Sequence, residues 1–411
     1  HSRNPSAKSS RQIPWNNTPV PSIDAVELFQ PETLQLIDSL SGVDDSRDLV
    51  ALVSALRKDG HPTGRIHQAL EQVRLRRRAQ DKFGAYAERM LFTEEGLEQA
   101  TRLAVAAHHA GRMKAAGIQR IIDGGCGIGG DAMAFAGLGL DVTAMDKDTT
   151  TAAIASYNLA PFPSVTVTQG AIEDAELSTA DGLWLDPARR DSSSKRLSPD
   201  KWSPPLNWAL DVAQTIPTGL KLAPGLDHRH IPPDGEAQWV SYRGSVAELV
   251  YWSGPLARPG ISRSALLVGD KKTVEMTGAG AAVDQPVGPL GAYIHEPDGA
   301  VIRAQLIGDL ARELGGSMVS KDIAYITGDS EVTSAFAQTF AIDTVLPLKE
   351  KDIQKWLRQE GIGVLEIKKR GVDIDPATFR HTLRLEGEKQ ATLIVTRVDG
   401  VRSAIMAHRI S

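Results

Sequence analysis

The segment IIDGGCGIGGDAMAFA, residues 121–136, has the residue types needed to hold a small ligand against its backbone. A short apolar run leads into a loop with alternating glycines, and a run that is typical of a helix follows. The loop residues are Asp123, Gly124, Gly125, Cys126, Gly127 and Gly129. Glycine tolerates positive φ and leaves the backbone bare, so a ligand can lie at the N-terminus of the following helix. The spacing also matches G-x-G-x-x-G, so the turn alone leaves open a dinucleotide and an adenosine-containing ligand with a charged end.

Acidic residues at the ends of predicted strands separate these two ligand classes. Asp123 precedes the first alternating glycine by two places, where it is poorly placed for a pyrophosphate and well placed for an ammonium group. Asp146 ends the next strand, VTAMD, and Lys147 follows it. A carboxylate at that position can accept hydrogen bonds from both hydroxyls of a ribose. Together with the strand tip described next, this pattern favours S-adenosylmethionine over a dinucleotide.

The run DGLWLDPARR places further polar groups at the tip of another predicted strand. We expect Asp186 and the carbonyl of Pro187 to accept hydrogen bonds from a nucleophilic amine and to orient its lone pair toward a methyl donor. Arg189 would hold a base or an adjacent phosphate. Methyl transfer from a sulfonium is an in-line displacement that needs positioning rather than a covalent enzyme intermediate. On this motif alone, a turn in which Asp186 caps a helix and the arginine is solvated stays open.

The histidines and the single cysteine do not suggest a metal centre. His108-His109 and the H-x-H pair of His228 and His230 have no paired acidic or cysteine ligand in the sequence, so we expect surface or loop histidines and no metal. Cys126 lies in the glycine loop rather than beside the DPAR motif, which disfavours a mechanism with a cysteine nucleophile. A single cysteine also forbids an internal disulfide and indicates a reducing compartment.

The composition indicates a soluble protein of two or three domains, because the chain has 411 residues and 41% of them are hydrophobic. No apolar run is long enough for a membrane span, and the N-terminal residues lack the apolar core of a secretion signal, so we expect a cytoplasmic protein without membrane contact. The net charge of −5 by itself argues against nucleic acid. Residues 345–411, however, carry 13 Lys+Arg against 9 Asp+Glu, a net of +4, which is compatible with a phosphate-binding surface.

Hydrophobic periodicity places these motifs in an α/β fold. From Ile118 to about residue 270, short apolar runs alternate with helical runs, as βα units on a parallel sheet of about seven strands do. Before this region, Thr93 is expected to cap a helix that ends at Gly117. The predicted divisions are a flexible N-terminus (1–21), a helical domain (22–117), the ligand-binding domain (118–270), a connecting segment with a helix (271–344) and a small α+β domain (345–411). The sequence makes no prediction about the oligomeric state.

The motifs resemble those of the class I S-adenosylmethionine-dependent methyltransferases over about residues 90–270. The resemblance rests on DGGCGIGG, on the second-strand acid Asp146 and on DPAR at the fourth strand. Within that family, LFTEEGLEQATRLAVAAHHAGR and AMDKD are similar to segments of trimethylguanosine synthase and its relatives. Near the C-terminus, LEIKKRGVDIDP resembles the THUMP-like domain that accompanies a group of bacterial predicted methyltransferases.

The resemblance implies a Rossmann-like seven-stranded methyltransferase sheet, S-adenosyl-L-methionine as the cofactor, and RNA, such as tRNA or rRNA, as the partner. By the same resemblance, the glycine loop contacts the methionine part of the cofactor, Asp146 the ribose, and Ala171 and Ile172 the adenine. Many members have Asp directly after the glycine that corresponds to Gly170, where this chain has Ala171. Amine methyltransferases also favour an aromatic residue at the strand tip, where this chain has Arg189, so an arginine would replace the stacking ring.

Four functions follow from these readings. The sequence favours an enzyme that methylates a base nitrogen of RNA. The alternatives are a small-molecule methyltransferase, a non-catalytic RNA-binding protein with a methyltransferase-like fold, and a dinucleotide-dependent oxidoreductase.

Overall fold

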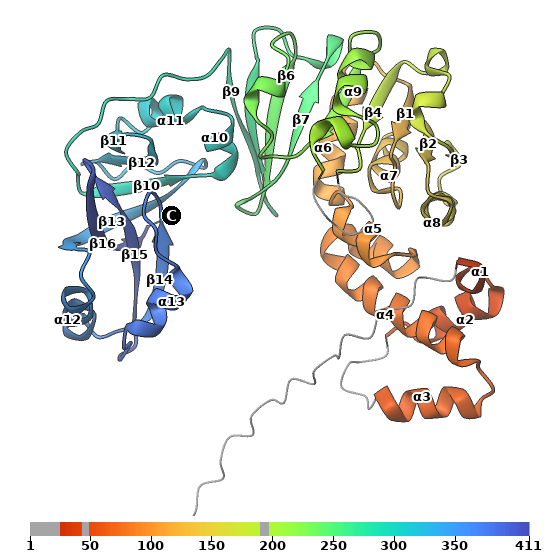
Figure 1. Ribbon diagram of the computed structural model, residues 1–411, viewed down its shortest axis with the longest axis horizontal. Coiled ribbons are helices and arrows are strands. Elements are labelled where there is room, and N and C mark those ends of the chain that lie inside the picture. The colour runs from red at the N-terminus through yellow and green to blue at the C-terminus, as the bar shows by residue number, and fades with distance from the viewer. Residues whose placement is uncertain (1–24, 43–48, 190–196, 411) are drawn as a thin grey trace, which may run out of the picture. The chain divides into compact units, whose positions relative to one another are not determined.

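The computed structural model describes residues 25–42, 49–189 and 197–410, and these residues form two compact units that divide after Gln99 (Figure 1). The predicted flexible segment 1–21 lies outside the described residues. The helices of the first unit are α1 (Ala25–Leu28), α2 (Pro31–Ser39), α3 (Leu49–Lys58), α4 (Thr63–Phe83) and α5 (Glu94–Gln99). A 3-10 helix, η1 (Gly84–Arg89), follows α4.

The first unit is built around α4. Its buried residues recur every three or four positions, as on one side of a helix, and the helix packs against α1 and α2. The buried residues are Ile66, Ala69, Gln72, Leu75, Arg76, Ala79 and Phe83. The basic run of this helix is neutralised in part, because Arg74 and Arg78 both form ion pairs with Glu94 at the start of α5. Those arginines therefore do not form a purely cationic surface.

The helix expected from Glu94 to Gly117 is two helices. After α5 the chain extends through Arg102 and begins α6 (Leu103–Ala115), which belongs to the second unit. Thr101 lies in the extended segment between these helices, and its hydroxyl donates a hydrogen bond to Asp131 over 2.7 Å. The first unit is thus shorter than the helical domain expected over 22–117.

The second unit begins with a sheet of nine strands in the described part of the chain, ordered β3-β2-β1-β4-β5-β7-β6-β8-β9. The strands are β1 (Arg120–Gly124), β2 (Asp141–Asp146), β3 (Val165–Gln169), β4 (Gly182–Leu185), β5 (Thr218–Leu222), β6 (Glu236–Tyr242), β7 (Ser245–Trp252), β8 (Arg263–Val268) and β9 (Thr273–Gly278). The intervening helices include α7 (Gly130–Gly137), α8 (Thr149–Leu159) and α9 (Leu206–Ala213). From β1 to β5 the strands alternate with helices, as expected for residues 118–270. From β5 to β9, however, no α-helix of the described chain separates one strand from the next, so the expected alternation is correct only for the first part of this range.

The first five strands run parallel and follow the doubly wound order 3-2-1-4-5. The order in which successive strands are added to the sheet reverses between β1 and β4, and ligands of such sheets bind at the carboxyl ends of the strands beside that point. The sheet has more than the seven expected strands because β9 adds an antiparallel edge to β8, and because β6 and β7 form a hairpin within it. Both the glycine loop and the DPAR motif follow strands that flank the reversal point.

A second sheet holds seven strands in the described residues, ordered β11-β12-β10-β13-β16-β15-β14. They are β10 (Tyr293–Pro297), β11 (Ser317–Ser320), β12 (Ile323–Gly328), β13 (Ala337–Pro347), β14 (Ile362–Lys369), β15 (Lys389–Val398) and β16 (Val401–Arg409). Its helices are α10 (Gly299–Arg303), α11 (Ile307–Glu313), α12 (Glu350–Glu360) and α13 (Pro376–Thr382). The hairpin between β15 and β16 turns at Asp399-Gly400, as expected, with both residues at positive φ.

Residues 271–344 do more than connect two domains. They contribute β9 to the first sheet and β10 to β13 to the second, and α10 and α11 pack against the first sheet in one continuous hydrophobic cluster. The second sheet also curls. Lys368 on its edge strand β14 reaches Glu296 on β10 over 2.6 Å, although three strands separate them in the sheet order.

Candidate active site

The glycine loop joins β1 to α7 at the carboxyl edge of the first sheet. Gly125 has φ +81°, and a Cβ there would lie 2.6 Å from the backbone oxygen of Asp186. Gly129 has φ +94°, and its Cβ would lie 2.9 Å from the side chain of Leu159. Only glycine suits these two positions. At Gly127, φ is +55° and no atom of the described chain lies within 4 Å of a Cβ, so this part of the loop borders open space.

Asp123 is the buried acid at the end of β1. Its exposed fraction is 1%, and among the described residues neither carboxyl oxygen has a hydrogen-bond partner. Burial, together with the nearby carboxylates of Asp131 and Asp186, raises the pKa of Asp123 well above its usual range. An unpartnered buried carboxyl group is costly. A ligand that brought an ammonium group to this position would satisfy it, which is how S-adenosylmethionine fits the site.

Asp146 organises the loop from the end of β2. One carboxylate oxygen accepts the Gly127 N–H over 3.1 Å, and the other accepts the Asp148 N–H over 2.9 Å. Burial raises the pKa of Asp146. Each carboxylate oxygen keeps a second lone pair, so Asp146 can still accept hydrogen bonds from ribose hydroxyls. The neighbouring Lys147 donates to the hydroxyl of Ser203 over 2.8 Å, so its ammonium has a protein partner.

The residues predicted to contact adenine differ in their surroundings. Ile172 is 4% exposed and belongs to the hydrophobic core, and its side chain occupies the space that a Cβ on Gly124 would need. Gly124 and Ile172 therefore shape the loop by packing against each other. Ala171, which precedes the 3-10 helix η2 (Ile172–Asp174), is only partly buried, and its role in adenine binding stays a prediction.

Cys126 is a buried thiol within the glycine loop. Its exposed fraction is 8%, and its Sγ lies 3.6 Å from the carbonyl oxygen of Gly127. Burial, with the charges of Asp123 and Asp146, raises the pKa of Cys126 well above its usual range. The thiolate is the nucleophilic form of cysteine, so this residue is not prepared for covalent chemistry.

The DPAR motif follows β4 and contacts the glycine loop. The Asp186 N–H donates to the Gly124 carbonyl over 3.1 Å, and an Asp186 carboxylate oxygen accepts from the Lys221 ammonium over 2.7 Å. The Asp186 side chain is 25% exposed, so it is reachable from solvent while it is held on one side. Pro187 is buried, and Arg189 is half-buried with its carbonyl accepting the Leu197 N–H.

A chain of buried polar groups continues behind Asp186, and sequence reasoning missed it. Lys221 on β5 donates to Thr101 over 2.8 Å, and Thr101 donates to Asp131 on α7 over 2.7 Å. His109 on α6 lies between Asp131 at 2.8 Å and Glu248 on β7 at 2.6 Å. The order is Asp186, Lys221, Thr101, Asp131, His109 and Glu248, which we call the buried network.

His109 is the cation at the inner end of the buried network. Burial acts to lower its pKa, but Glu248 and Asp131 outweigh burial and raise it to about 9. Its ring stacks on Trp184 with the centroids 4.3 Å apart. The expectation that His109 is a surface or loop histidine is wrong, because its acidic partners come from elements that are distant in the sequence. A signal was present in β5 and β7, where Lys221 and Glu248 interrupt otherwise apolar runs.

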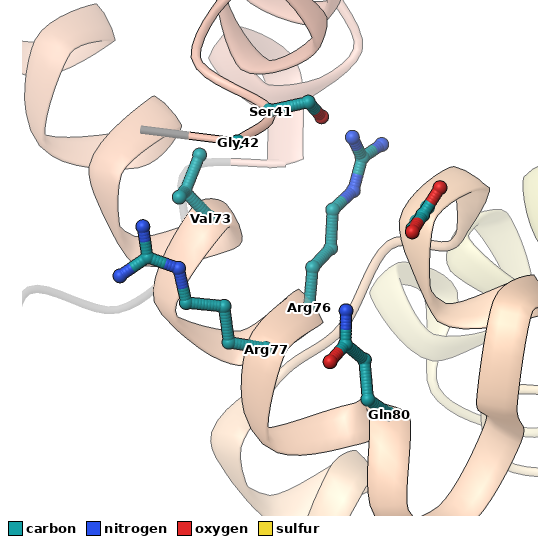
Figure 2. A pocket seen from close by; sticks show the side chains of 7 residues that line it. Ser41, Gly42, Val73, Arg76, Arg77 and Gln80 are labelled. Carbon is teal, nitrogen blue, oxygen red and sulfur yellow. The ribbon is translucent and has the colours of Figure 1, made fainter. Parts of the chain in front are cut away.

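The first unit contains a separate cavity of about 370 Å³, shown in Figure 2. It is lined by Ser41, Gly42, Val73, Arg76, Arg77, Gln80 and Glu88. Two nitrogens of the Arg76 guanidinium have partners, because its Nε donates to the Met90 carbonyl over 2.9 Å and its Nη1 pairs with Asp38 over 3.0 Å. Its buried Nη2 has no hydrogen-bond partner among the described residues. None of the predicted site residues lines this cavity.

The described residues contain neither a candidate metal site nor a candidate membrane-spanning helix. No group of three or more His, Cys, Asp or Glu side chains within them could hold a metal ion. None of the helices described is both long enough and apolar enough to cross a membrane.

This chain is similar to two described families, to a curated relative and to a solved structure. Residues 337–409 match the family described as THUMP domain-like, and residues 24–79 match a domain of unknown function, DUF8688. An uncharacterised S-adenosylmethionine-dependent methyltransferase of Mycobacterium tuberculosis, present in two strains, is 32% identical over 347 residues, which cover 80% of this chain and 92% of that protein. A crystal structure from Porphyromonas gingivalis W83, provisionally named a methyltransferase, superimposes with a TM-score of 0.73 at 17% identity and covers 93% of this chain and 100% of the other.

Proposed function

Since the chain belongs to the S-adenosylmethionine-dependent methyltransferases, we propose that it methylates RNA, such as tRNA or rRNA, at an exocyclic amine or a ring nitrogen of a base. The comparisons agree with the sequence predictions of an α/β methyltransferase fold, of methyltransferase activity and of S-adenosylmethionine as the cofactor. The observation that carries the proposed chemistry is the contact between the two motifs, in which the Asp186 N–H donates to the carbonyl of Gly124 over 3.1 Å. This contact joins the DPAR motif to the glycine loop, which supports the proposal that Asp186 binds the acceptor beside the cofactor.

The cofactor-binding residues supply charge and shape. When bound, S-adenosylmethionine supplies an electrophilic methyl group on a sulfonium. Asp123 would receive the ammonium group, since it is buried and unpartnered among the described residues. Asp146, which already fixes the loop through the Gly127 N–H, would accept the ribose hydroxyls. The open space beside Gly127 leaves room for the ligand along the backbone.

The acceptor side holds and orients a nitrogen. Asp186 and the Pro187 carbonyl would accept hydrogen bonds from an amine and direct its lone pair at the methyl carbon. A nitrogen held in this way would accept the methyl group that the cofactor supplies and would release its surplus proton to solvent. Asp186 stabilises the positive charge that develops on the nitrogen. Arg189, which is half-buried beside this motif, would contact the base or a phosphate.

The C-terminal region supports RNA as the substrate. It matches the THUMP domain-like family, and residues 345–411 carry a net charge of +4. Lys368 and Arg370 pair with Glu296, so they contribute less free charge than their run in the sequence suggests. The exposed side chains of Lys351, Lys355 and Arg358 on α12 form a better candidate for phosphate contact, and we call them the basic face of α12.

Nucleoside analysis tests the proposal. RNA from cells that lack this protein should miss one methylated nucleoside, and the purified chain should restore it with labelled S-adenosylmethionine. Asp186→Asn should keep cofactor binding and retain only a low, measurable rate of transfer, whereas Asp123→Ala should lose both binding and transfer. If no methylated nucleoside disappears, or if the label enters a small molecule of a cell extract instead, RNA is not the substrate.

A further inference from the structure

The acceptor carboxylate is held from behind by a lysine. Asp186 is 25% exposed, but the Lys221 ammonium that binds its Oδ2 over 2.7 Å has a side chain only 6% exposed. Lys221 thus approaches Asp186 from the protein interior and leaves the solvent side of the carboxylate for an acceptor. Among the described residues, the Lys221 ammonium donates hydrogen bonds to Asp186 and Thr101 and to no residue of the glycine loop.

The lysine is itself fixed by the rest of the buried network. Its second hydrogen bond goes to the Thr101 hydroxyl, and that hydroxyl is held in turn because it donates to Asp131. A displaced ammonium would lose its hydrogen bonds to both Asp186 and Thr101. Asp131 is anchored by His109, and His109 by Glu248 on β7. The position of Lys221 therefore depends on α6, α7 and β7, and on the segment before α6 that carries Thr101.

The charges of the buried network explain why the lysine remains an ammonium. Burial acts to lower the pKa of Lys221, but Asp186, Asp131 and Glu248 raise it above its ordinary value. Among the described residues, the network sets Lys221 and His109 against three carboxylates. Breaking one buried ion pair leaves an uncompensated charge, so each member depends on the others.

We propose that Lys221 is a positioning residue of the methyl transfer step, which fixes one oxygen of Asp186 so that the other can hold the acceptor nitrogen. This inference rests on the proposed function, because it assigns Asp186 to the acceptor. The amine must face the methyl carbon in line with the breaking bond, and displacements near 1 Å cost about 100-fold in rate. A carboxylate free to rotate would share its hydrogen bonds among several orientations. Lys221 removes that freedom.

The first experiment is a double-mutant cycle on the full chain, with total RNA from cells lacking the protein as the acceptor. Lys221→Met should lower kcat by about 10- to 100-fold and leave the Kd of S-adenosylmethionine unchanged within about twofold. In the Asp186→Asn background, Lys221→Met should cause no further loss of kcat. An equal loss in both backgrounds would overturn the inference, because a lysine with a purely structural role would act independently of Asp186.

Two further variants separate positioning from stability. Thr101→Val removes the hydroxyl that holds the ammonium but keeps the charge of Lys221, and it should lower kcat less than Lys221→Met does. Arg258→Met is the matched control, since it removes a cation from another ion network of the same sheet, with Glu236 and Glu275, that does not touch Asp186. It should lower the melting temperature without lowering kcat of the folded protein.

Crystal structures with S-adenosylhomocysteine test the inference even if RNA proves to be the wrong acceptor. The carboxylate of Asp186 should occupy one orientation in the wild-type chain and several in Lys221→Met. Thr101→Val serves the same purpose if Lys221→Met does not fold. A carboxylate that keeps its single orientation in the variant overturns the role of Lys221, whereas inactivity of the wild-type chain on RNA overturns only the substrate assignment.

Discussion

Replacing Asp123 by Asn should reduce the loss of folding stability that the protein shows as the pH rises, and it should weaken cofactor binding. Asp123 is 1% exposed, has no hydrogen-bond partner among the described residues, and has a pKa well above the usual range because of burial and neighbouring carboxylates. A group whose pKa is raised by folding stabilises the folded chain fully below its unfolded pKa. That contribution is lost as the pH rises through the folded pKa.

The size of the effect follows from this shift. Between the unfolded pKa of about 3.9 and the folded pKa, wild-type stability should fall relative to Asp123→Asn by up to about 1.4 kcal/mol per pH unit. The difference in free energy of unfolding between the two proteins should therefore keep growing as the pH rises from the unfolded pKa to the folded pKa. The buried amide of the variant costs about 1–3 kcal/mol at every pH. The test is therefore how the difference in free energy of unfolding changes with pH, and not its value at one pH.

Urea unfolding measures this slope through tryptophan fluorescence. Trp184, Trp239 and Trp252 are fully buried in the same unit as Asp123, so their emission reports its unfolding. Asp141→Asn, which removes an exposed carboxylate at the start of β2, controls for the change in net charge. Calorimetry should show that Asp123→Asn binds S-adenosylmethionine about 10- to 100-fold more weakly, because a hydrogen bond to a charged group contributes about 1.5–3 kcal/mol.

Two results would refute this account of Asp123. A stability difference that does not change with pH would mean that the carboxyl group has a partner in solution. An unchanged affinity for S-adenosylmethionine would mean that the ammonium group binds elsewhere.

Three further predictions concern the loop, the buried network and the RNA surface. Gly125→Ala should destabilise folding by more than Gly127→Ala in urea unfolding, because only the first Cβ meets a backbone atom, at 2.6 Å; the second should cost about 1–2 kcal/mol for its positive φ. Equal losses would contradict the described loop. His109→Gln should abolish a loss of stability that the wild-type chain shows between about pH 6.5 and 9, since the pKa of His109 is raised to about 9 and its stabilising charge disappears through that range; an identical pH profile for the variant would exclude a charged His109. Changing the three residues of the basic face of α12 to Gln should weaken RNA binding and flatten its salt dependence, measured by fluorescence anisotropy, whereas Lys271→Gln with Lys272→Gln on the β8–β9 turn should not.

Local chemistry made much of the site predictable. Glycines at Gly125 and Gly129 were expected from their alternation, and the structure explains them by positive φ and close contacts. Asp123 and Asp146 were expected at strand ends because ligands of parallel sheets bind there. These inferences needed only the order of apolar runs and the residues that follow them.

The buried network was not predictable in the same way. Its ion pairs join residues far apart in the sequence, such as His109 and Glu248, which are 139 positions apart. No local period brings α6 beside β7, so the pairing depends on how the sheet is assembled. Ile172 shows the converse case, because a residue at a family's ligand-binding position packs into the core of this chain. The second sheet has more strands than the sequence indicated, because β10 to β12 are short runs within Gly- and Pro-containing sequence.

The contact between the glycine loop and the strand tip has a consequence for protein engineering. A Cβ on Gly125 would meet the backbone oxygen of Asp186, and the Asp186 N–H is bonded to Gly124. Substitutions selected in the loop to accept an altered cofactor should therefore also move Asp186. In a directed-evolution library, cofactor preference and the rate of transfer should change together. Variants that recover activity should carry compensating substitutions near β4 rather than in the loop alone.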